Sequence, residues 1–285
     1  MKKNNVFIII ALLIAACTYY AMATEEQDVP IATRMVLDAA GEVGRSAIKS
    51  VYMIYCPKTK AKGTGFLIRS GYIITNEHVI RGNSHNEIEA YSPYREAISF
   101  SSMIVNAEKD IAILKPTKEL EGGLEFYSND NLLVGESLST WGFPLGYNGP
   151  APLLSVGYLS GFSVKQIKDT KSYVKHLVVN GAFNPGNSGG PLFLANYNKV
   201  IGIVVSKHAP IDKYTQSAID ALASGRSGGM AFTRTDGNGK KTSVAESQVV
   251  AEVLMYFRNM TQVMIGEAIS VSELKAVLSE YKIKC

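Results

Sequence analysis

Short apolar runs separated by turn residues fill the middle of the chain, between residues 51 and 205. Glycine, proline and asparagine interrupt this pattern repeatedly, as expected where strands end in turns. The runs lie at residues 51–55, 65–68, 73–75, 111–114, 177–179 and 200–205. Many short strands with turns between them favour an all-β core built from barrels or a sandwich.

Helical spacing appears on either side of this region. Residues 30 to about 44 carry apolar side chains at Ile31, Met35, Val36 and Ala39, and residues 244–257 show a similar period. Apolar residues three or four positions apart are typical of amphipathic helices. We therefore expect an N-terminal helix and a helical extension over residues 241–285.

The last helix is expected from residue 271 to about residue 281. Ser270 stands at its N-cap position, and Glu273 three residues later completes the pattern of a capping box.

The N-terminus has the pattern of an export signal. Lys2 and Lys3 precede an apolar run of about eleven residues, and small residues suited to signal-peptidase cleavage follow at 21–23. The run is shorter than the roughly 18 residues of a spanning helix, which makes a retained membrane anchor the weaker interpretation. We expect residues 1–23 to be a signal peptide and the protein to be periplasmic or secreted. Alternatively, Cys17 ends a lipobox, so that a lipid anchor at Cys17 tethers the protein to the envelope.

Charge and composition exclude several kinds of partner and site. The chain of 285 residues is 46% hydrophobic and 19% charged, and loss of residues 1–23 lowers its net charge from +4 to +2. No basic block suggests nucleic acid binding, and the four histidines show no metal-ligand spacing, so we expect no metal and no other cofactor. After cleavage Cys56 and Cys285 remain, either paired or as two free thiols.

Residues 184–192 read Asn-Pro-Gly-Asn-Ser-Gly-Gly-Pro-Leu. Glycines this dense around one serine allow the backbone to present a hydroxyl beside free amide protons. Ser188 is therefore the candidate nucleophile for acyl transfer, and the amides of Gly186 and Ser188 are candidate donors to an oxyanion.

A serine nucleophile requires a base and a group that orients the base. His78 follows an apolar strand and a polar turn, and Asp110 comes directly before an apolar run. Either residue alone is a weak signal, because lone histidines and aspartates at strand ends are usually structural. Together with Ser188 they form a candidate catalytic triad.

The order His78, Asp110, Ser188, with Gly63-Thr-Gly-Phe-Leu-Ile upstream, resembles the chymotrypsin-like (trypsin-like) serine peptidases. It is most similar to the HtrA/Deg-type bacterial branch, over roughly residues 45–235. Residues 141–146 (Trp-Gly-Phe-Pro-Leu-Gly) and 155–160 (Ser-Val-Gly-Tyr-Leu-Ser) resemble further family segments, and residues 229–232 (Gly-Met-Ala-Phe) resemble its closing strand.

The resemblance implies a fold of two antiparallel six-stranded β-barrels, at about residues 45–125 and 126–235 of a peptidase domain spanning 24–240. His78 and Asp110 would come from the first barrel and Ser188 from the second, with the cleft between them. The resemblance also implies a serine endopeptidase that hydrolyses polypeptide substrates through an acyl-enzyme. The residues after Met230 are helical in pattern, so we expect no PDZ module.

Two neighbours of the serine bear on specificity and activation. The family's primary specificity pocket falls on Ala182 and Phe183, which offer no carboxylate to a basic side chain, so we expect cleavage after small or medium apolar residues. Asn187 stands where pancreatic-type relatives carry an aspartate that pairs with a new N-terminus, which argues against activation by that kind of cleavage.

Residues 212–223 predict one more short helix within an insertion after the serine segment. The insertion either flanks the substrate cleft or is a surface excursion without a role. Two other functions also remain open. One is a catalytically silent barrel that binds peptides or acts like a chaperone, and the other is a different acyl hydrolase, which the residue order His, Asp, Ser disfavours.

Overall fold

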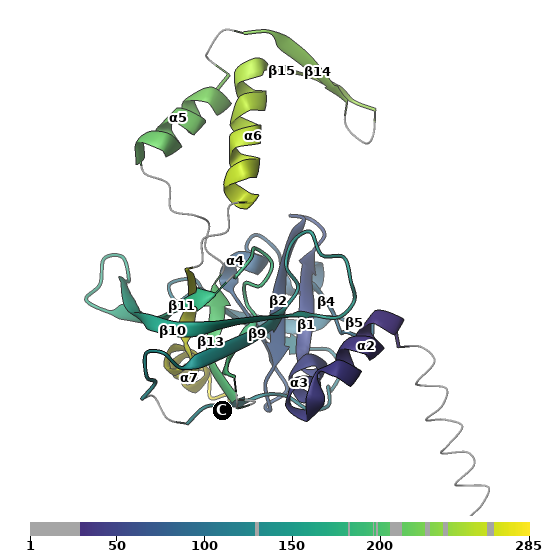
Figure 1. Cartoon of the computed structure of the whole chain (residues 1–285), viewed down its shortest axis with the longest axis vertical. Coiled ribbons are helices and arrows are strands. Elements are labelled where there is room, and N and C mark those ends of the chain that lie inside the picture. The colour runs from purple at the N-terminus through teal and green to yellow at the C-terminus, as the bar shows by residue number, and fades with distance from the viewer. Residues whose placement is uncertain are drawn as a thin grey trace, which may run out of the picture.

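The computed structural model describes residues 29–128, 131–181, 183–195, 197, 199–205, 213–225, 229–235, 239–260 and 265–285. The expected signal peptide with Cys17, and Ala182 of the expected specificity pocket, lie outside these residues. Within them, two β-units lie side by side, with helices packed at their ends (Figure 1). No helix in these ranges is both long and apolar enough to span a bilayer.

The first unit is a seven-stranded sheet with the order β5-β4-β1-β2-β3-β7-β6, and all neighbouring strands are antiparallel. Its inner face is filled by aliphatic side chains such as Ile54, Leu67 and Leu114, all fully buried. The strands are β1 (Val51–Cys56), β2 (Ala61–Leu67), β3 (Ile73–Thr75), β4 (Glu89–Tyr91), β5 (Ala97–Ile98), β6 (Phe100–Asn106) and β7 (Ile111–Pro116).

The second unit is a closed barrel of six strands, because β12 pairs with both β9 and β13. Closure leaves no unpaired edge among these six strands. The short β8 (Glu125–Phe126) adds to β13 in parallel. The barrel strands are β9 (Ser137–Gly142), β10 (Leu153–Gln166), β11 (Tyr173–Gly181), β12 (Pro191–Leu194), β13 (Lys199–Val205) and β16 (Gly266–Ser270).

This architecture confirms the expected all-β core with two barrel-like units and accessory helices. The first unit differs in detail, since it is a nearly closed sheet of seven strands rather than six. The short β4 and β5 extend the sheet beyond β1. The short runs between residues 51 and 205 thus predicted the correct fold class.

The expected closing strand at residues 229–232 is wrong. The barrel is closed by β16, which pairs with β11 on one side and β13 on the other and is buried along its whole length. Residues 231–235 instead form β14 (Ala231–Thr235), which pairs with β15 (Lys241–Ala245) in a separate hairpin. β16 therefore lies inside the segment expected to be a helical extension.

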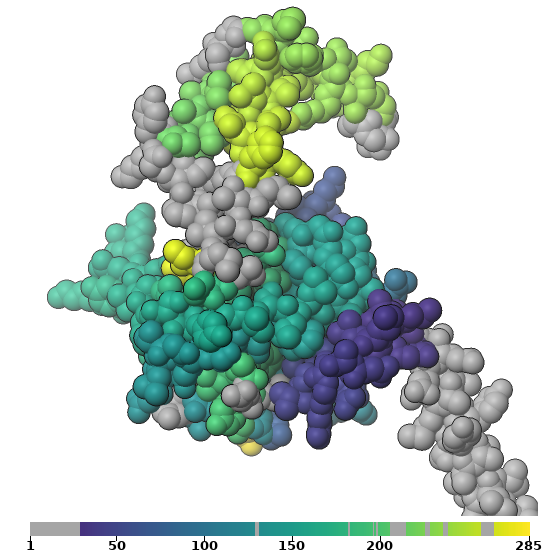
Figure 2. All heavy atoms as spheres, in the orientation of Figure 1, coloured from purple at the N-terminus to yellow at the C-terminus, as the bar shows by residue number. Residues whose placement is uncertain are grey.

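A helical insertion separates β13 from β16. It contains α5 (Lys213–Ala223), the β14–β15 hairpin and α6 (Glu246–Met260), and α5 packs on α6. These elements stand away from the barrels in Figure 1 and form the protruding part in Figure 2. The helices expected at residues 212–223 and 244–257 correspond to α5 and α6.

The helices at the two ends pack on the barrels. The single helix expected from residue 30 is two helices, α2 (Ile31–Ala39) and α3 (Gly41–Lys49), with a break where Gly41 adopts a φ of 64°. The last helix, α7 (Val271–Glu280), begins as expected at Ser270, whose side chain accepts a hydrogen bond from the Ser272 amide. The expected capping box is wrong, because the Glu273 carboxylate contacts Lys175 and Lys109 instead.

One apolar cluster joins the two units. Phe66 and Ile113 of the first sheet belong to the same buried cluster as Trp141 and Ile203 of the second. Ile48 of α3 is also part of this cluster. The residues that follow β3 and the residues that precede β12 are thereby held near one another.

Candidate active site

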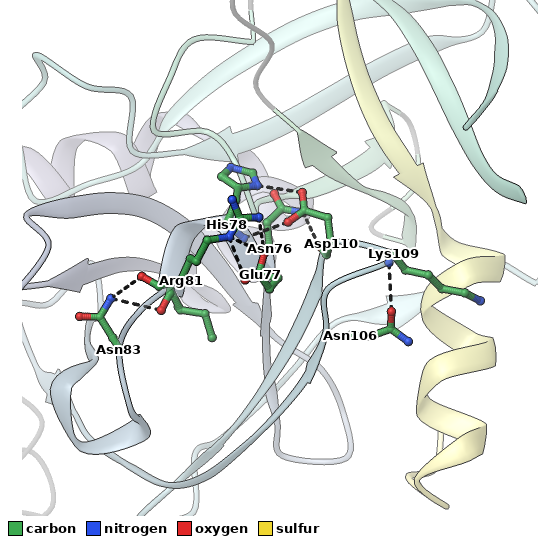
Figure 3. A network of polar contacts seen from close by, with 9 residues as sticks. Asn76, Glu77, His78, Arg81, Asn83, Asn106, Lys109 and Asp110 are labelled. Atoms are coloured by element: carbon green, nitrogen blue, oxygen red, sulfur yellow. Dashed lines mark hydrogen bonds and ion pairs between the residues drawn. The ribbon is translucent and has the colours of Figure 1, made fainter. Parts of the chain in front are cut away.

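His78 and Asp110 are brought together by the first unit. His78 lies in the short helix α4 (Glu77–Ile80), directly after β3, and Asp110 precedes β7, which is the neighbour of β3 in the sheet. The His78 Nδ1 donates to Asp110 Oδ2 at 2.8 Å, and the His78 amide donates to Asp110 Oδ1 at 2.9 Å (Figure 3). One carboxylate thus fixes both the ring and the backbone of the histidine.

The backbone at Asp110 is in an uncommon conformation. Its φ is 55°, in the left-handed region that costs a non-glycine residue about 1–3 kcal/mol where the surroundings enforce it. Its carbonyl accepts a hydrogen bond of 3.0 Å from the buried side-chain amide of Asn76. The structure therefore holds this carboxylate in place from both its side chain and its main chain.

A second link runs from the neighbouring residue to the last helix. Lys109 points toward α7 (Figure 3), and its Nζ lies 2.9 Å from Glu273 Oε2, with both side chains largely buried. The Glu273 Oε1 accepts a hydrogen bond of 3.0 Å from the Lys175 amide on β11. The Glu273 side chain thus joins the segment before Asp110 to the second barrel.

Arg81 lies beside the pair on the solvent side. Its guanidinium donates to both carboxylate oxygens of the buried Glu77, and hydrogen bonding and charge attraction from Glu77, with a smaller contribution from Asp110, raise the pKa of Arg81. Glu77, the first residue of α4 and the neighbour of His78 in the sequence, thereby has a cationic partner (Figure 3).

The serine lies in two consecutive turns. The Asn187 amide donates to the Asn184 carbonyl at 3.0 Å, and the Gly190 amide donates to the Asn187 carbonyl at 3.0 Å. In each turn the third residue is a glycine with positive φ, 98° at Gly186 and 85° at Gly189. A type II turn requires a positive φ at its third residue, which glycine supplies in both turns, and the first turn also has the proline that is common in the second position. Ser188 is the second residue of the second turn.

The first turn also fixes the direction of the Gly186 amide. The Pro185 carbonyl accepts a hydrogen bond of 2.6 Å from the Leu145 amide. In a trans peptide the N–H points away from the C=O, so the Gly186 N–H faces away from Leu145. A Cβ at Gly186 would lie 2.5 Å from the Phe143 carbonyl, so only glycine fits in this turn.

Thr64 connects the serine turn to the first unit. Its Oγ1 donates to the Gly186 carbonyl at 2.7 Å and accepts from the Phe143 amide at 3.0 Å. Its own amide donates to the Ser188 carbonyl at 2.8 Å. Thr64 is fully buried and therefore fixes the main chain on both sides of residue 187.

The second turn packs against the start of the His78 segment. A Cβ at Gly189 would collide with Thr64 and Thr75 and would come within 3.0 Å of the Asn76 amide. Asn76 is two residues before His78, so Ser188 and His78 belong to segments in direct contact. On the other side, the Gly189 amide donates to the Val204 carbonyl at 2.8 Å.

Of the two residues expected to form the specificity pocket, only Phe183 is described. Phe183 is buried, and its ring lies so close to Gly266 that any side chain at position 266 would collide with it. Gly266 begins β16, so this ring packs where the barrel closes. Asn187 is also buried and lies against Gly142.

Cys56 and Cys285 are free thiols, so the unpaired alternative holds. Cys56 is buried in the first unit, where burial raises its pKa to about 11, whereas Cys285 is exposed. Within the described ranges, no group of His, Cys, Asp and Glu side chains is arranged to hold a metal ion.

Sequence reasoning missed three positions that shape the site: Thr64, Val204 and Gly266. Gly63-Thr-Gly was noted only as part of a resemblance, although a small polar residue between two glycines indicates a close approach of backbones. Val204 makes its contacts through main-chain atoms, which no side-chain pattern reveals.

A family model described as the trypsin-like peptidase domain matches residues 63–203. The chain is 31% identical over 147 residues to a probable periplasmic serine endoprotease DegP-like of Pseudomonas fulva, which covers 51% of this chain and 29% of that protein. It is 31% identical over 150 residues to the putative serine protease HhoB of Synechocystis. That alignment covers 52% of this chain and 35% of HhoB. The chain thus spans about a third or less of the length of these relatives.

Among solved structures, the inactive form of the Rv3671c protease aligns with a TM-score of 0.56 at 18% identity, covering 88% of this chain and 96% of that chain. The active form of that protease from M. tuberculosis aligns with a TM-score of 0.51 at 22% identity, covering 62% and 78%. At these identities the likeness concerns the fold.

Proposed function

Because the family model of the trypsin-like peptidase domain matches residues 63–203, we propose that the chain is a serine endopeptidase that uses His78, Asp110 and Ser188. The observation that carries the proposal is the two-point hydrogen bonding of His78 by Asp110, at 2.8 Å and 2.9 Å, on a segment that packs against the Ser188 turn.

The orientation of His78 defines its part in the reaction. When Nδ1 carries the proton that it donates to Asp110, Nε2 is left as the acceptor. His78 then takes the Ser188 proton during attack on a peptide carbonyl and returns it to the leaving amine. Water repeats the cycle on the acyl-enzyme, while the Asp110 carboxylate stabilises the imidazolium.

The amides of Gly186 and Ser188 hold the oxyanion in this mechanism. Support comes from the Pro185 carbonyl, whose hydrogen bond to Leu145 turns the Gly186 N–H the other way, and from Thr64, which fixes the same turn. Donors already in position need no reorganisation when charge develops on the substrate oxygen.

For specificity, we propose a pocket at Ala182 and Phe183 that takes small or medium apolar side chains before the scissile bond. Phe183 is an apolar wall backed by Gly266, and burial of an unpaired cation against it is unfavourable. Cleavage profiling on a peptide library tests this, and dominant cleavage after Arg or Lys contradicts it.

One of the relatives named above is described as a probable periplasmic serine endoprotease. We propose that this protein is likewise exported, as a periplasmic or secreted protein or, if Cys17 is lipidated, as one anchored to the envelope. Mass spectrometry of the mature N-terminus distinguishes a free residue after position 23 from a lipidated Cys17.

The decisive experiment is labelling with a fluorophosphonate probe, which reacts with activated serines. We expect labelling of the wild-type protein, loss of labelling in Ser188→Ala, and a fall in kcat of about 10⁶-fold on a cleavable peptide. Ser160→Ala, an exposed serine on β10, is the matched control and should label normally. Folded wild-type protein that does not label would support a silent binding barrel instead.

A further inference from the structure

A cavity of about 490 Å³ lies between the first unit and the loop over residues 143–150. Its size is within the range of small ligand sites. Its lining is mainly apolar and includes four aromatic and two basic side chains: Tyr55, Tyr91, Phe143 and Tyr147, with Lys62 and Arg95.

Two walls of this cavity are the segments that hold the Ser188 turn. Lys62 is two residues before Thr64, whose amide binds the Ser188 carbonyl. Phe143 donates its amide to Thr64 Oγ1 at 3.0 Å. The cavity therefore opens beside the proposed reaction centre, on the side of β1 and β2.

The cavity and the described part of the proposed specificity pocket are lined by different elements, since the cavity borders β1, β2 and β4 of the first unit. Phe183 packs against Gly266 at the closure of the second barrel. We infer that a substrate whose residue before the scissile bond lies against Phe183 of the second barrel extends past Ser188 toward the first unit, whose Thr64 amide binds the Ser188 carbonyl. The residues after the scissile bond are then the ones that reach the cavity.

The charged groups in the cavity wall are both cations. The Lys62 Nζ is partly buried and donates to the Tyr147 carbonyl at 2.8 Å and, at 3.5 Å, to the Pro144 carbonyl, which leaves one N–H group of the ammonium for a ligand. Burial lowers the pKa of Lys62, as expected for a cation without a carboxylate partner nearby. Arg95 is exposed at the rim, and the carboxylate of the neighbouring Glu89 is hydrogen-bonded by the Tyr91 hydroxyl.

We propose that this cavity binds a carboxylate of the polypeptide substrate after the scissile bond, with Lys62 and Arg95 as its cationic partners. The carboxylate belongs either to a Glu or Asp side chain or to the C-terminus of the substrate. This inference rests on the proposed endopeptidase function and adds a specificity site to it.

The test uses pairs of quenched fluorescent peptides that share one cleavage site. In one series Glu replaces Gln at each of the positions after the scissile bond. In the other, peptides ending at those positions carry a free carboxylate or an amide. We expect kcat/KM about tenfold higher for one Glu peptide over its Gln partner, or for one acid over its amide, which identifies the source of the carboxylate.

Substitutions in the cavity wall test whether a preference for acidic peptides arises at this cavity. Arg95→Gln should reduce the ratio of acidic to neutral kcat/KM several-fold, and Lys62→Met should reduce it further. Lys168→Gln, which removes an exposed charge from the β10–β11 hairpin, should leave the ratio and the basal rate unchanged. Raising the salt concentration should also lower the ratio, because ions screen the rim charge.

The same peptide sequences, labelled with the fluorophore but without the quencher, can be tested for binding to Ser188→Ala by fluorescence anisotropy. This measurement tests the carboxylate site independently of the proposed peptidase activity. Tighter binding of the acidic peptide that Arg95→Gln weakens supports the carboxylate site even if no cleavage occurs. Equal kcat/KM and equal binding for every acidic and neutral pair would overturn the proposal while leaving the peptidase function intact.

Discussion

The histidine and aspartate segment and the serine turn are held in place by different kinds of contact. His78 is positioned by one side chain, the Asp110 carboxylate, through two hydrogen bonds. Ser188 is positioned mainly by backbone geometry, through two turns with glycines at φ values of 98° and 85°. The first half of the site therefore depends on chemical identity, and the second half depends on space and conformation.

Asp110→Asn tests the chemical half and, among the variants that test this comparison, should have the largest effect on turnover. An asparagine can present its N–H to His78 Nδ1 and so favour the wrong tautomer, which by analogy with other triads lowers kcat by about 10⁴-fold. The fold should survive, because asparagine tolerates the left-handed backbone of φ 55°. Steady-state kinetics on a cleavable peptide measure the loss.

Asp169→Asn is the matched control, since Asp169 is also a left-handed aspartate, with φ 61°, on the exposed β10–β11 hairpin. Its activity should equal that of the wild type. An Asp110→Asn enzyme within tenfold of wild-type kcat would mean that the Asp110 carboxylate does not set the tautomer of His78.

Gly186→Ala tests the conformational half. The new Cβ would lie 2.5 Å from the Phe143 carbonyl and 2.6 Å from the Leu145 amide, so the turn must shift. Loss of one oxyanion donor costs about 10²–10³-fold in kcat, and we expect a loss of that size. Gly135→Ala is the control: it has a similar φ of 96° but open space around the Cβ, so it imposes backbone strain without the collision. Equal losses of kcat in the two variants would refute a special role for the turn.

This contrast explains how much of the site the sequence could reveal. Ser188, His78 and Asp110 could be proposed from the sequence because each has a residue type that the chemistry demands. Thr64 was not given a role, because its importance comes from three hydrogen bonds that exist only when the two units meet. Positions that act through backbone contacts leave no comparable mark in the sequence.

In the fold, too, local features could be predicted from the sequence, whereas features set by tertiary contacts could not. Short runs with turns between them predicted the all-β core, since alternation and length are local properties. The closing strand was misplaced because residues 229–232 and the start of β16 have similar sequences: each begins with a glycine and has an alanine in the third position and a large apolar residue in the fourth. Only pairing with β11 and β13 distinguishes them, and pairing partners are set by tertiary structure. Glu273 likewise fits a capping box locally but is drawn to Lys109 and Lys175.

Thr64→Val links the two halves and should have an intermediate effect. Valine keeps the shape but removes the hydroxyl that binds the Gly186 carbonyl and the Phe143 amide. We expect kcat to fall about tenfold or more with little change in KM, because the oxyanion turn loosens while the substrate pocket is retained. Thr64→Ser keeps the oxygen and should recover most of the rate. A Thr64→Ser enzyme as slow as Thr64→Val would show that the methyl group, rather than the hydroxyl, matters.

Glu273→Gln probes the connection between the two halves and should have the smallest effect on rate. The Lys109 ammonium would lose a partner at 2.9 Å while remaining only 17% exposed, whereas glutamine can still accept from the Lys175 amide. Removing one member of a largely buried pair leaves the other charge uncompensated, so we expect about 2 kcal/mol loss in the free energy of unfolding by urea denaturation. Because Lys109 adjoins the strained Asp110, kcat should also fall, by a few-fold.

The double variant Lys109→Met with Glu273→Gln separates the ion pair from the individual residues. If the pair accounts for the effect, the double variant should be more stable than the sum of the two single losses predicts, since no unpaired charge remains. A loss of stability without any change in kcat would mean that α7 supports the fold but does not position Asp110. A few-fold change in kcat that the double variant shares would instead show that the action of Asp110 depends on the contact between Lys109 and the last helix. That helix also binds the second barrel through the Lys175 amide.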